Sequence, residues 1–234
     1  MFQTDVPFFH TRADPMAPTD TRQRLLEAAE RLFGSLGFAE TSLRALTSAA
    51  ETNLAAVNYH FGSKEGLFKE VVQGVVAPVN RERLRLLDEL ESRSETGDSP
   101  QLDEILRAFF GPALALGTRP DAQGERLRKL MGRIRFEGSA VDESVHEVFE
   151  EVEGRFGPAF MRALPHLSPK GLFWRLHFAL GVMCSTMFNP NQVQLISDGL
   201  CNPTDVQETL DQMVRFVSAG FVAADVEAAQ GVTG

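Results

Sequence analysis

The sequence has few of the residues that mark disulfide-rich or metal-binding proteins. Its 234 residues include two cysteines, one tryptophan and one tyrosine. Cys184 and Cys201 lie in different expected elements and form no CxxC pair, so the sequence indicates neither a disulfide framework nor a zinc site. We therefore expect no bound metal and interpret both thiols as buried or neutral side chains.

Long apolar runs and targeting segments are also missing. No apolar run approaches the roughly 18 residues that a membrane-spanning helix needs. The first twenty residues have no basic start followed by an apolar segment, which is the pattern of a signal peptide. With 43% hydrophobic and 24% charged residues, the chain is expected to be a soluble, cytoplasmic, globular protein without a membrane partner.

Catalytic signatures are absent too. The sequence contains no HExxH, GxSxG, P-loop or Rossmann pattern. The five histidines are scattered along the chain, at His10, His60, His146, His166 and His177. We therefore predict a protein that is not an enzyme and needs no cofactor, and a small enzyme remains the disfavoured alternative.

The formal charge of −9 is distributed unevenly. Residues 20–75 carry six basic and seven acidic side chains, whereas residues 76–234 carry sixteen basic and twenty-three acidic ones. Phosphate binding depends mainly on Lys and Arg. A near-neutral N-terminal part permits specific DNA binding but predicts weak non-specific binding, and the acidity belongs to the C-terminal part.

The periodicity of apolar residues predicts an all-α protein, because helical spacing recurs and strand alternation does not. The expected domains are a flexible arm at 1–18, a three-helix helix-turn-helix DNA-binding domain at 19–63, and a helical effector-binding and dimerisation domain at 64–229. Further helices are predicted at about 79–94, 102–117, 122–137, 142–163, 168–188 and 204–229.

Capping residues predict where the N-terminal helices begin and end. The first helix should open near Thr19 or Asp20 and stop at Gly37. The next helices should be capped by Thr41 or Ser42, then by Asn53, with Leu54 and Val57 packing on the preceding helix. Ser63 should cap a fourth helix, and Pro78 should kink or end it.

Residues 38–69 predict a DNA-reading element, in which the second helix of a helix-turn-helix enters the major groove. Ala55 and Ala56 let the backbone approach the bases, Asn58 can pair with adenine, and the free amides of the next helix offer a phosphate seat. Taken singly, each such residue is more commonly scaffold, and their joint arrangement carries the prediction. The candidate DNA-contacting residues are Thr41, Ser42, Arg44, Asn53, Ala55, Ala56, Asn58, Tyr59, His60 and Lys64.

Two segments of this region resemble the N-terminal DNA-binding domain of TetR-family repressors, namely LLEAAERLFGSLGFAETSLRAL and VNYHFGSKEGLF. The resemblance implies a homodimer, a palindromic double-stranded DNA operator and a C-terminal domain that binds a small effector. One departure is the turn from Ala50 to Asn53, where the family usually has Gly then Val. Glu51 there would cost on the order of 1 kcal/mol in a left-handed conformation and would mildly repel DNA.

Two C-terminal stretches, 129–138 and 172–188, predict an apolar effector cavity rich in Phe and Met. One face of 172–188 could line it while another forms a dimer seam with Leu210, Met213, Val214, Val217 and Phe221; the alternative is that all are ordinary core residues. The arginines and His177 could meet a carboxylate or phosphate. The candidate effector-binding residues are Met131, Arg133, Arg135, Phe136, Phe173, Trp174, His177, Phe178 and Met183.

The chain also resembles the PsrA-type subgroup of TetR regulators, in the segments LFWRLHF, RALPHLSP and NLAAVNYHFGSK. This similarity covers most of 20–190 and fades from 189 to 203. It implies a response to long-chain fatty acids or their CoA esters. A drug, an aromatic compound or a signalling ligand remains the alternative effector.

Overall fold

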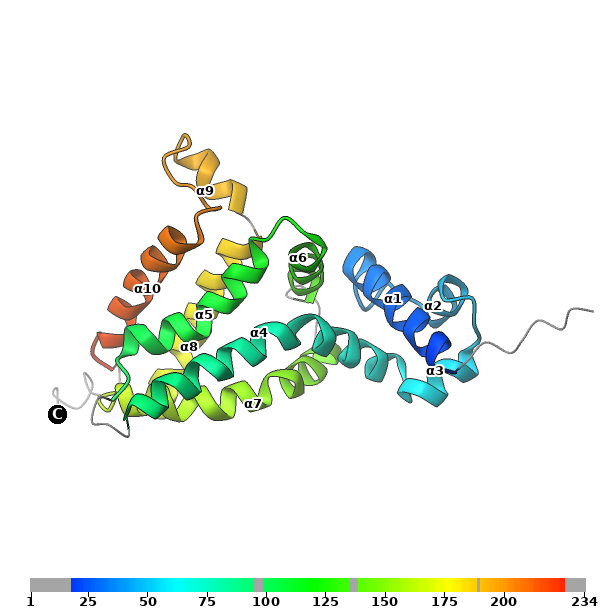
Figure 1. Ribbon diagram of the computed structural model, residues 1–234, viewed down its shortest axis with the longest axis horizontal. Helices are drawn as coiled ribbons and strands as arrows, with labels where there is room; N and C mark the ends of the chain where they lie inside the picture. The colour runs from blue at the N-terminus through cyan, green and yellow to red at the C-terminus, as the bar shows by residue number, and fades with distance from the viewer. Residues whose placement is uncertain (1–17, 95–98, 135–138, 189, 226–234) are drawn as a thin grey trace, which may run out of the picture.

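The structure is a computed structural model that describes residues 18–94, 99–134, 139–188 and 190–225. These residues form helices and no strands, which confirms the all-α prediction (Figure 1). The predicted arm lies almost wholly outside the described residues. The helices are α1 (Pro18–Leu36), α2 (Leu43–Ala49), α3 (Leu54–Phe61), α4 (Lys64–Ser94), α5 (Leu102–Gly117), α6 (Ala122–Ile134), α7 (Ser139–Ala163), α8 (Pro169–Phe188), α9 (Pro190–Ile196) and α10 (Val206–Val222).

The first three helices and the start of α4 share a small apolar core. Phe33 of α1 stacks edge-on to Phe68 of α4 at 5.1 Å between ring centroids, and Phe38 lies 5.0 Å from the same ring. Leu46 of α2 and Val57 of α3 are fully buried beneath them. Because each short helix contributes few apolar residues, α2 and α3 depend on this shared core for their stability.

Helix α4 runs without interruption from Lys64 to Ser94, past Pro78. Of the two outcomes predicted for Pro78, an end of the helix is therefore wrong: the fourth helix, capped by Ser63, and the helix expected at about 79–94 are one arched element (Figure 1). Pro78 removes one backbone donor, but Val75, Val76 and Val79 around it are buried. Their packing compensates for the lost hydrogen bond.

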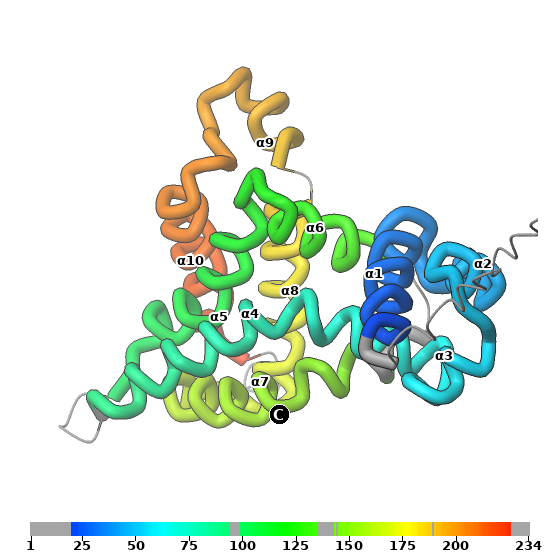
Figure 2. The backbone as a smooth tube through the Cα atoms, turned by 45° about the vertical axis from the view of Figure 1, so that its right-hand side comes forward, coloured from blue at the N-terminus to red at the C-terminus, as the bar shows by residue number. Residues whose placement is uncertain are grey.

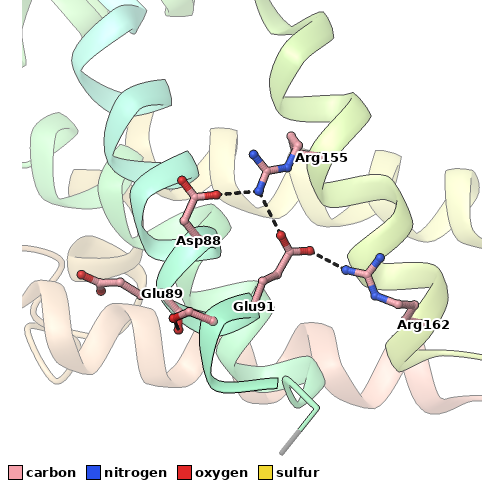
Figure 3. A network of polar contacts seen from close by, with 6 residues as sticks. Asp88, Glu89, Glu91, Arg155 and Arg162 are labelled. Carbon is pink, nitrogen blue, oxygen red and sulfur yellow. Dashed lines mark hydrogen bonds and ion pairs between the residues drawn. The ribbon is translucent and has the colours of Figure 1, made fainter. Parts of the chain in front are cut away.

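Helices α4 and α7 pack side by side and are joined by arginine–carboxylate contacts (Figure 3). Arg155 binds Asp88 at 2.6 Å and Glu91 at 2.9 Å, and Arg162 binds the second oxygen of Glu91 at 2.5 Å. The hydrogen bonds that Arg155 donates to Asp88 and Glu91 raise the pKa of its guanidinium. This network links α7 to the long helix that connects both halves of the chain.

The C-terminal core is dominated by aromatic rings from α5, α7 and α10. Phe109 lies 5.1 Å from Phe156, and Phe160 stacks on Phe221 at 5.9 Å. The helices predicted at 102–117, 142–163 and 168–188 are present, whereas α9 was not predicted. The last helix begins at Val206 and ends at Val222, seven residues before its predicted end.

Candidate nucleic-acid interface and sensor domain

Three side chains cap the helices of the reading head, by which we mean residues 20–69. The side-chain oxygens of Ser42, Asn53 and Ser63 each accept a hydrogen bond at 3.1 Å, from the amides of Ala45, Ala56 and Gly66. The predicted starts of α2, α3 and α4 are thereby confirmed. Such caps hold short helices in place at modest free-energy gain, so the orientation of α3 is set by local chemistry.

The turn between α2 and α3 has the strained residue that the sequence predicts. Glu51 has φ +50°, in the left-handed region. Arg24 donates to the Glu51 carbonyl at 3.5 Å and lies 3.9 Å from its carboxylate. The turn is therefore held from α1 by a cation.

Helix α3 turns a small, polar face to the outside. Ala55, Asn58 and Tyr59 are exposed, Tyr59 by 81%. Val57 is fully buried and anchors the helix, whereas Leu54 is 50% exposed. Of the two residues expected to pack on α2, Val57 is therefore the one that is fully enclosed, and Leu54 stays half exposed.

Few cations of the reading head are left to meet phosphates. Between residues 20 and 75, Arg31, Arg44 and Lys64 have no carboxylate within 4.0 Å among the described residues. Arg44 is exposed, and the Lys64 ammonium lies 4.2 Å from the centre of the Phe38 ring. The other basic side chains of this near-neutral region are paired with carboxylates, so only a few cations are available to bind phosphates.

The other predicted DNA-contacting residues differ in their exposure to solvent. Ser42 and Asn53 are exposed beside their capping bonds, and Ala56 and His60 are half-buried. Thr41 is fully buried and its hydroxyl donates to the Gly37 carbonyl at 2.6 Å. Thr41 therefore holds the loop before α2 together, and we leave it out of the proposed phosphate contacts.

Most predicted effector-binding residues of α8 lie on the outside of the protomer. Phe173, Trp174, His177 and Phe178 are exposed, Phe173 by 70%. The buried side of α8 is instead formed by Leu172, Ala179, Met183 and Met187. Nearly the whole surface of this helix is apolar, so its periodicity could not tell an inner from an outer face. The predicted effector residues of α8 are therefore divided between this exposed face and a buried one that holds Met183.

The residues predicted in and near α6 have a different role. Met131 is half-buried, and Arg133 donates to the Ser35 carbonyl of α1 at 2.8 Å. Arg126 forms a two-pronged ion pair with Glu30, also on α1. Helix α6 therefore ties the C-terminal domain to the reading head (Figure 2). The predicted effector residues Arg135 and Phe136 lie outside the described residues.

A groove of about 820 Å³ runs between α8 and α10. Trp174, Phe178 and Phe216 line it together with Arg175, which donates to the carbonyls of Gly220, Ala223 and Ala224 at 2.9–3.0 Å. The sequence predicted a dimer seam at Leu210, Met213, Val214, Val217 and Phe221. These residues are buried within the protomer, so the outward face of α10 is the opposite one, with Phe216 and Val222.

Sequence reasoning missed a buried cation, Arg83 of α4. Its side chain is 3% exposed and lies against Phe109 and Met183. Arg83 belongs to a run of charged residues that reads as a solvated face. The signal that could have found it is its spacing, because it falls four residues from both Val79 and Leu87, on the apolar stripe of α4.

No helix in the described part of the chain combines the length and the hydropathy that crossing a bilayer requires. Within those same residues, no cluster of three or more histidine, cysteine or acidic side chains is arranged to hold a metal ion.

Curated relatives of the chain are DNA-binding regulators. The chain is 33% identical over 90 residues to the HTH-type transcriptional repressor NicS of Pseudomonas putida, covering 38% of this chain and 40% of that protein. It is 34% identical over 108 residues to the regulatory protein RaaS of Mycobacterium tuberculosis, covering 46% and 48%. The chain thus spans less than half the length of these relatives.

Solved structures share the fold over most of the chain. The fatty acid degradation regulator FadR of Bacillus halodurans matches with a TM-score of 0.52 and 13% identity, covering 87% of this chain and 96% of that one. NalD, the secondary repressor of the MexAB-OprM multidrug efflux pump in Pseudomonas aeruginosa, matches with a TM-score of 0.51 and 23% identity, covering 85% and 97%. At these identities the likeness establishes the fold alone.

Two family models match successive parts of the chain. The model of bacterial regulatory proteins of the tetR family matches residues 25–71, which contain α2, α3 and their turn. The model of the tetracyclin repressor-like C-terminal domain matches residues 107–220. Together they cover more than half of the sequence, and they do not single out the PsrA-type subgroup. The chain belongs to the TetR family of transcriptional regulators.

Proposed function

We propose that this regulator is a homodimeric repressor that binds a palindromic operator through α3 of each protomer and is released by a hydrophobic effector. The observation that carries the proposal is the exposed face of α3. There a small residue, an amide and a phenol point outward from a helix that is anchored by buried Val57. This is the arrangement by which a recognition helix enters a major groove.

In this proposal each residue of the reading head has one role. Ala55 lets the helix approach the bases, and Asn58 pairs with an adenine edge. Tyr59 and Arg44 contact phosphates on either side of the groove, and Lys64 does so beside the first amides of α4. Ser42 and Asn53 act through their caps, which aim α2 and α3.

The proposed dimer seam is the outward face of α8 and α10. Five large apolar side chains are exposed there, which is unusual for a surface that stays in water: Phe173, Trp174, Phe178, Phe216 and Val222. The occupant we assign is a second copy of the chain, because one α3 reads only one half-site. A two-fold interface uses the same patch on both protomers.

Sedimentation velocity tests this seam. Phe178→Glu combined with Phe216→Glu should convert the dimer to monomer, because four charges would be buried in one interface. Tyr59→Glu, which places the same charge at an exposed aromatic position of the reading head, is the matched control and should stay dimeric. A wild-type protein that sediments as a monomer at micromolar concentration would contradict the proposal.

For the effector we propose the fatty-acyl class, on the strength of the subgroup resemblance and of the Phe- and Met-rich interior. Met131, Met183 and Met187 contact this core with flexible side chains that can make room for a long chain. The similar structures are named for fatty acid degradation in one case and multidrug efflux in the other. Their fold is therefore compatible with the alternative effector, a drug or aromatic compound.

Release from DNA would be a shift between two states of the dimer. In the binding state the two α3 helices lie about 34 Å apart, one turn of DNA. An effector that lowers operator affinity 100-fold must favour the other state by about 2.7 kcal/mol. The contacts of α6 with α1, through Arg126 and Arg133, and the continuous α4 offer the route for this coupling.

The decisive experiment is a selection of DNA fragments that the full chain binds, repeated with oleate, with oleoyl-CoA and without ligand. A palindromic consensus whose recovery falls with either acyl ligand supports the whole proposal. Recovery of an operator that neither ligand affects would retain the repressor and reject the acyl effector. Enrichment of no sequence would reject operator binding itself.

A further inference from the structure

A fully buried positive charge lies in the middle of the C-terminal domain. Arg83 projects from α4 and is enclosed by α5 and α8. Its Nε donates to the Phe109 carbonyl at 2.7 Å, one Nη to Asn80 Oδ1 at 3.2 Å, and the other Nη approaches Met183 Sδ at 3.9 Å. The guanidinium carbon also lies 4.6 Å from the centre of the Phe109 ring.

The charge of Arg83 has no carboxylate partner in the described part of the chain, and the neighbouring titratable group that raises its pKa, against the larger effect of burial, is the Cys184 thiol. Among the described residues, no carboxylate oxygen lies within 4.0 Å of its guanidinium. Burial lowers its pKa to about 10, which is still well above neutral pH, so the group keeps its proton. Buried arginines are nearly always paired with an acid, because an isolated charge in a low-dielectric interior is costly. Arg83 differs from Arg155 and Arg162 of the same domain, which have carboxylate partners but lie at the surface.

A scaffold role explains part of this arrangement. Pro112 removes the backbone donor that would meet the Ala108 carbonyl in α5, and the Nε of Arg83 donates to the neighbouring Phe109 carbonyl. A neutral donor would serve that purpose equally well. The scaffold role therefore accounts for one N–H group and leaves the charge without a function.

The Nη side of Arg83 is the place where an acceptor is missing. A guanidinium has five N–H donors, and the three contacts above use three of them. Sulfur is a weak acceptor, and Met183 is an unbranched side chain that can swing aside. A carboxylate at this position would accept two parallel hydrogen bonds, which is the geometry that arginine favours.

We propose that Arg83 is the recognition group for the carboxylate of an apolar effector that enters between α4, α5 and α8 and displaces the Met183 sulfur. The inference rests on the proposed function, since it assumes that the domain binds an effector. It assigns the chemical class: an apolar body that packs against Phe109 and Met183, and one carboxylate. Because Arg83 belongs to the helix that carries the reading head, the bound anion acts directly on α4.

The experiment compares carboxylates with neutral analogues of the same size. The full-length protein is titrated with octanoate, oleate and 1-naphthoate and with their primary amides, and the thermal midpoint and operator gel shift are recorded. At least one acid should raise the thermal midpoint and release DNA. Its amide should bind at least about tenfold more weakly, because the charged hydrogen bonds are lost. Arg83→Met should lose the same affinity, and Arg83→Lys should recover part of it.

The variants also separate this proposal from a scaffold role. Loss of ligand response in Arg83→Met with operator binding intact supports the site. Equal binding of acids and amides, an unchanged response in Arg83→Met, or no response to any of the three acids would overturn it. Should Arg83→Met fail to fold, the guanidinium nitrogen resonances of the wild-type protein decide: they must shift with the acids and stay with the amides. Wild-type protein that binds acids but no operator would refute the proposed function and leave this site standing.

Discussion

Single backbone positions of the reading head set its shape, and Glu51 is the position where its backbone departs from the ordinary. A non-glycine residue at φ +50° loses on the order of 1 kcal/mol relative to glycine in that conformation. The loop tolerates it because Arg24 contacts both its carbonyl and its carboxylate. A glycine at this position would gain less stability than its ease in this conformation suggests, because it also has more conformational freedom in the unfolded chain.

The first prediction is that Glu51→Gly stabilises the protein by about 0.5–1 kcal/mol, measured by urea unfolding. Glu51→Ala is the control, since it removes the same carboxylate and keeps the unfavourable φ. Both variants should bind operator slightly more tightly at low salt, because a negative charge is lost near DNA. Equal stabilisation by Gly and Ala would show that the carboxylate, and not the backbone, is responsible.

A second residue-scale prediction concerns Gly66, in the first turn of α4. A Cβ there would lie 2.1 Å from the Phe61 carbonyl oxygen, a backbone atom that cannot move aside cheaply. Gly66→Ala should cost about 1–3 kcal/mol of stability and weaken operator binding. Gly74→Ala in the same helix has nothing within 4 Å of the new Cβ. It should gain about 0.5–1 kcal/mol, and thermal unfolding of the pair provides the comparison.

At the scale of elements, α8 and α10 are held together by groups at their ends. Arg175 of α8 donates to three carbonyls at the C-terminus of α10, and Asp225, after α10, accepts from the amide and hydroxyl of Ser168 before α8. These contacts satisfy the unpaired backbone groups that every helix end leaves. They also fix the relative position of the two helices on which the proposed dimer seam is built.

The third prediction is that Arg175→Met destabilises the domain by about 1–3 kcal/mol, because charged hydrogen bonds to the carbonyls of α10 are lost. The dimer should also dissociate at a higher concentration. Arg107→Met is the matched control, since Arg107 also contacts α10 but through an exposed ion pair with Asp211, whose contribution is about 0–1 kcal/mol. If both variants lose equal stability in thermal unfolding, the capping role of Arg175 is refuted.

For the whole molecule, the salt dependence of DNA binding reports how many reading heads act together. Each phosphate contact adds about 0.9 to the slope of log affinity against log salt concentration. The double variant Arg44→Ala, Lys64→Ala removes two contacts from each protomer. In a dimer on a palindrome its slope should be shallower by about 3.6, and for a single head by about 1.8.

Gel shifts between 50 and 300 mM salt measure this slope, with Arg162→Ala on α7 as a control for loss of a distant cation. A normal slope in the double variant would show that the assigned phosphate contacts are wrong. A difference of half the expected size would show that one head binds at a time, which contradicts the dimeric mode.

The sequence by itself determined the all-α fold and the caps at Ser42, Asn53 and Ser63, and its resemblance to the family indicated the positive φ at Glu51. These features are local: a side-chain oxygen reaches an amide three residues away, and a turn needs one conformation at one residue. The segment from Gly37 to Phe68 could be predicted in most of its detail because its contacts lie close together along the chain.

Only the tertiary structure decided which face of each C-terminal helix is inside. Helix α8 is apolar on nearly all sides, so the burial of Met183 and the exposure of Trp174 depend on where α5 and α10 lie. The continuity of α4 through Pro78, the binding of Arg133 to α1 and the burial of Arg83 likewise arise from partners distant in sequence. Periodicity shows that a helix has an apolar stripe, but the choice between two stripes is made by the packing of the whole domain.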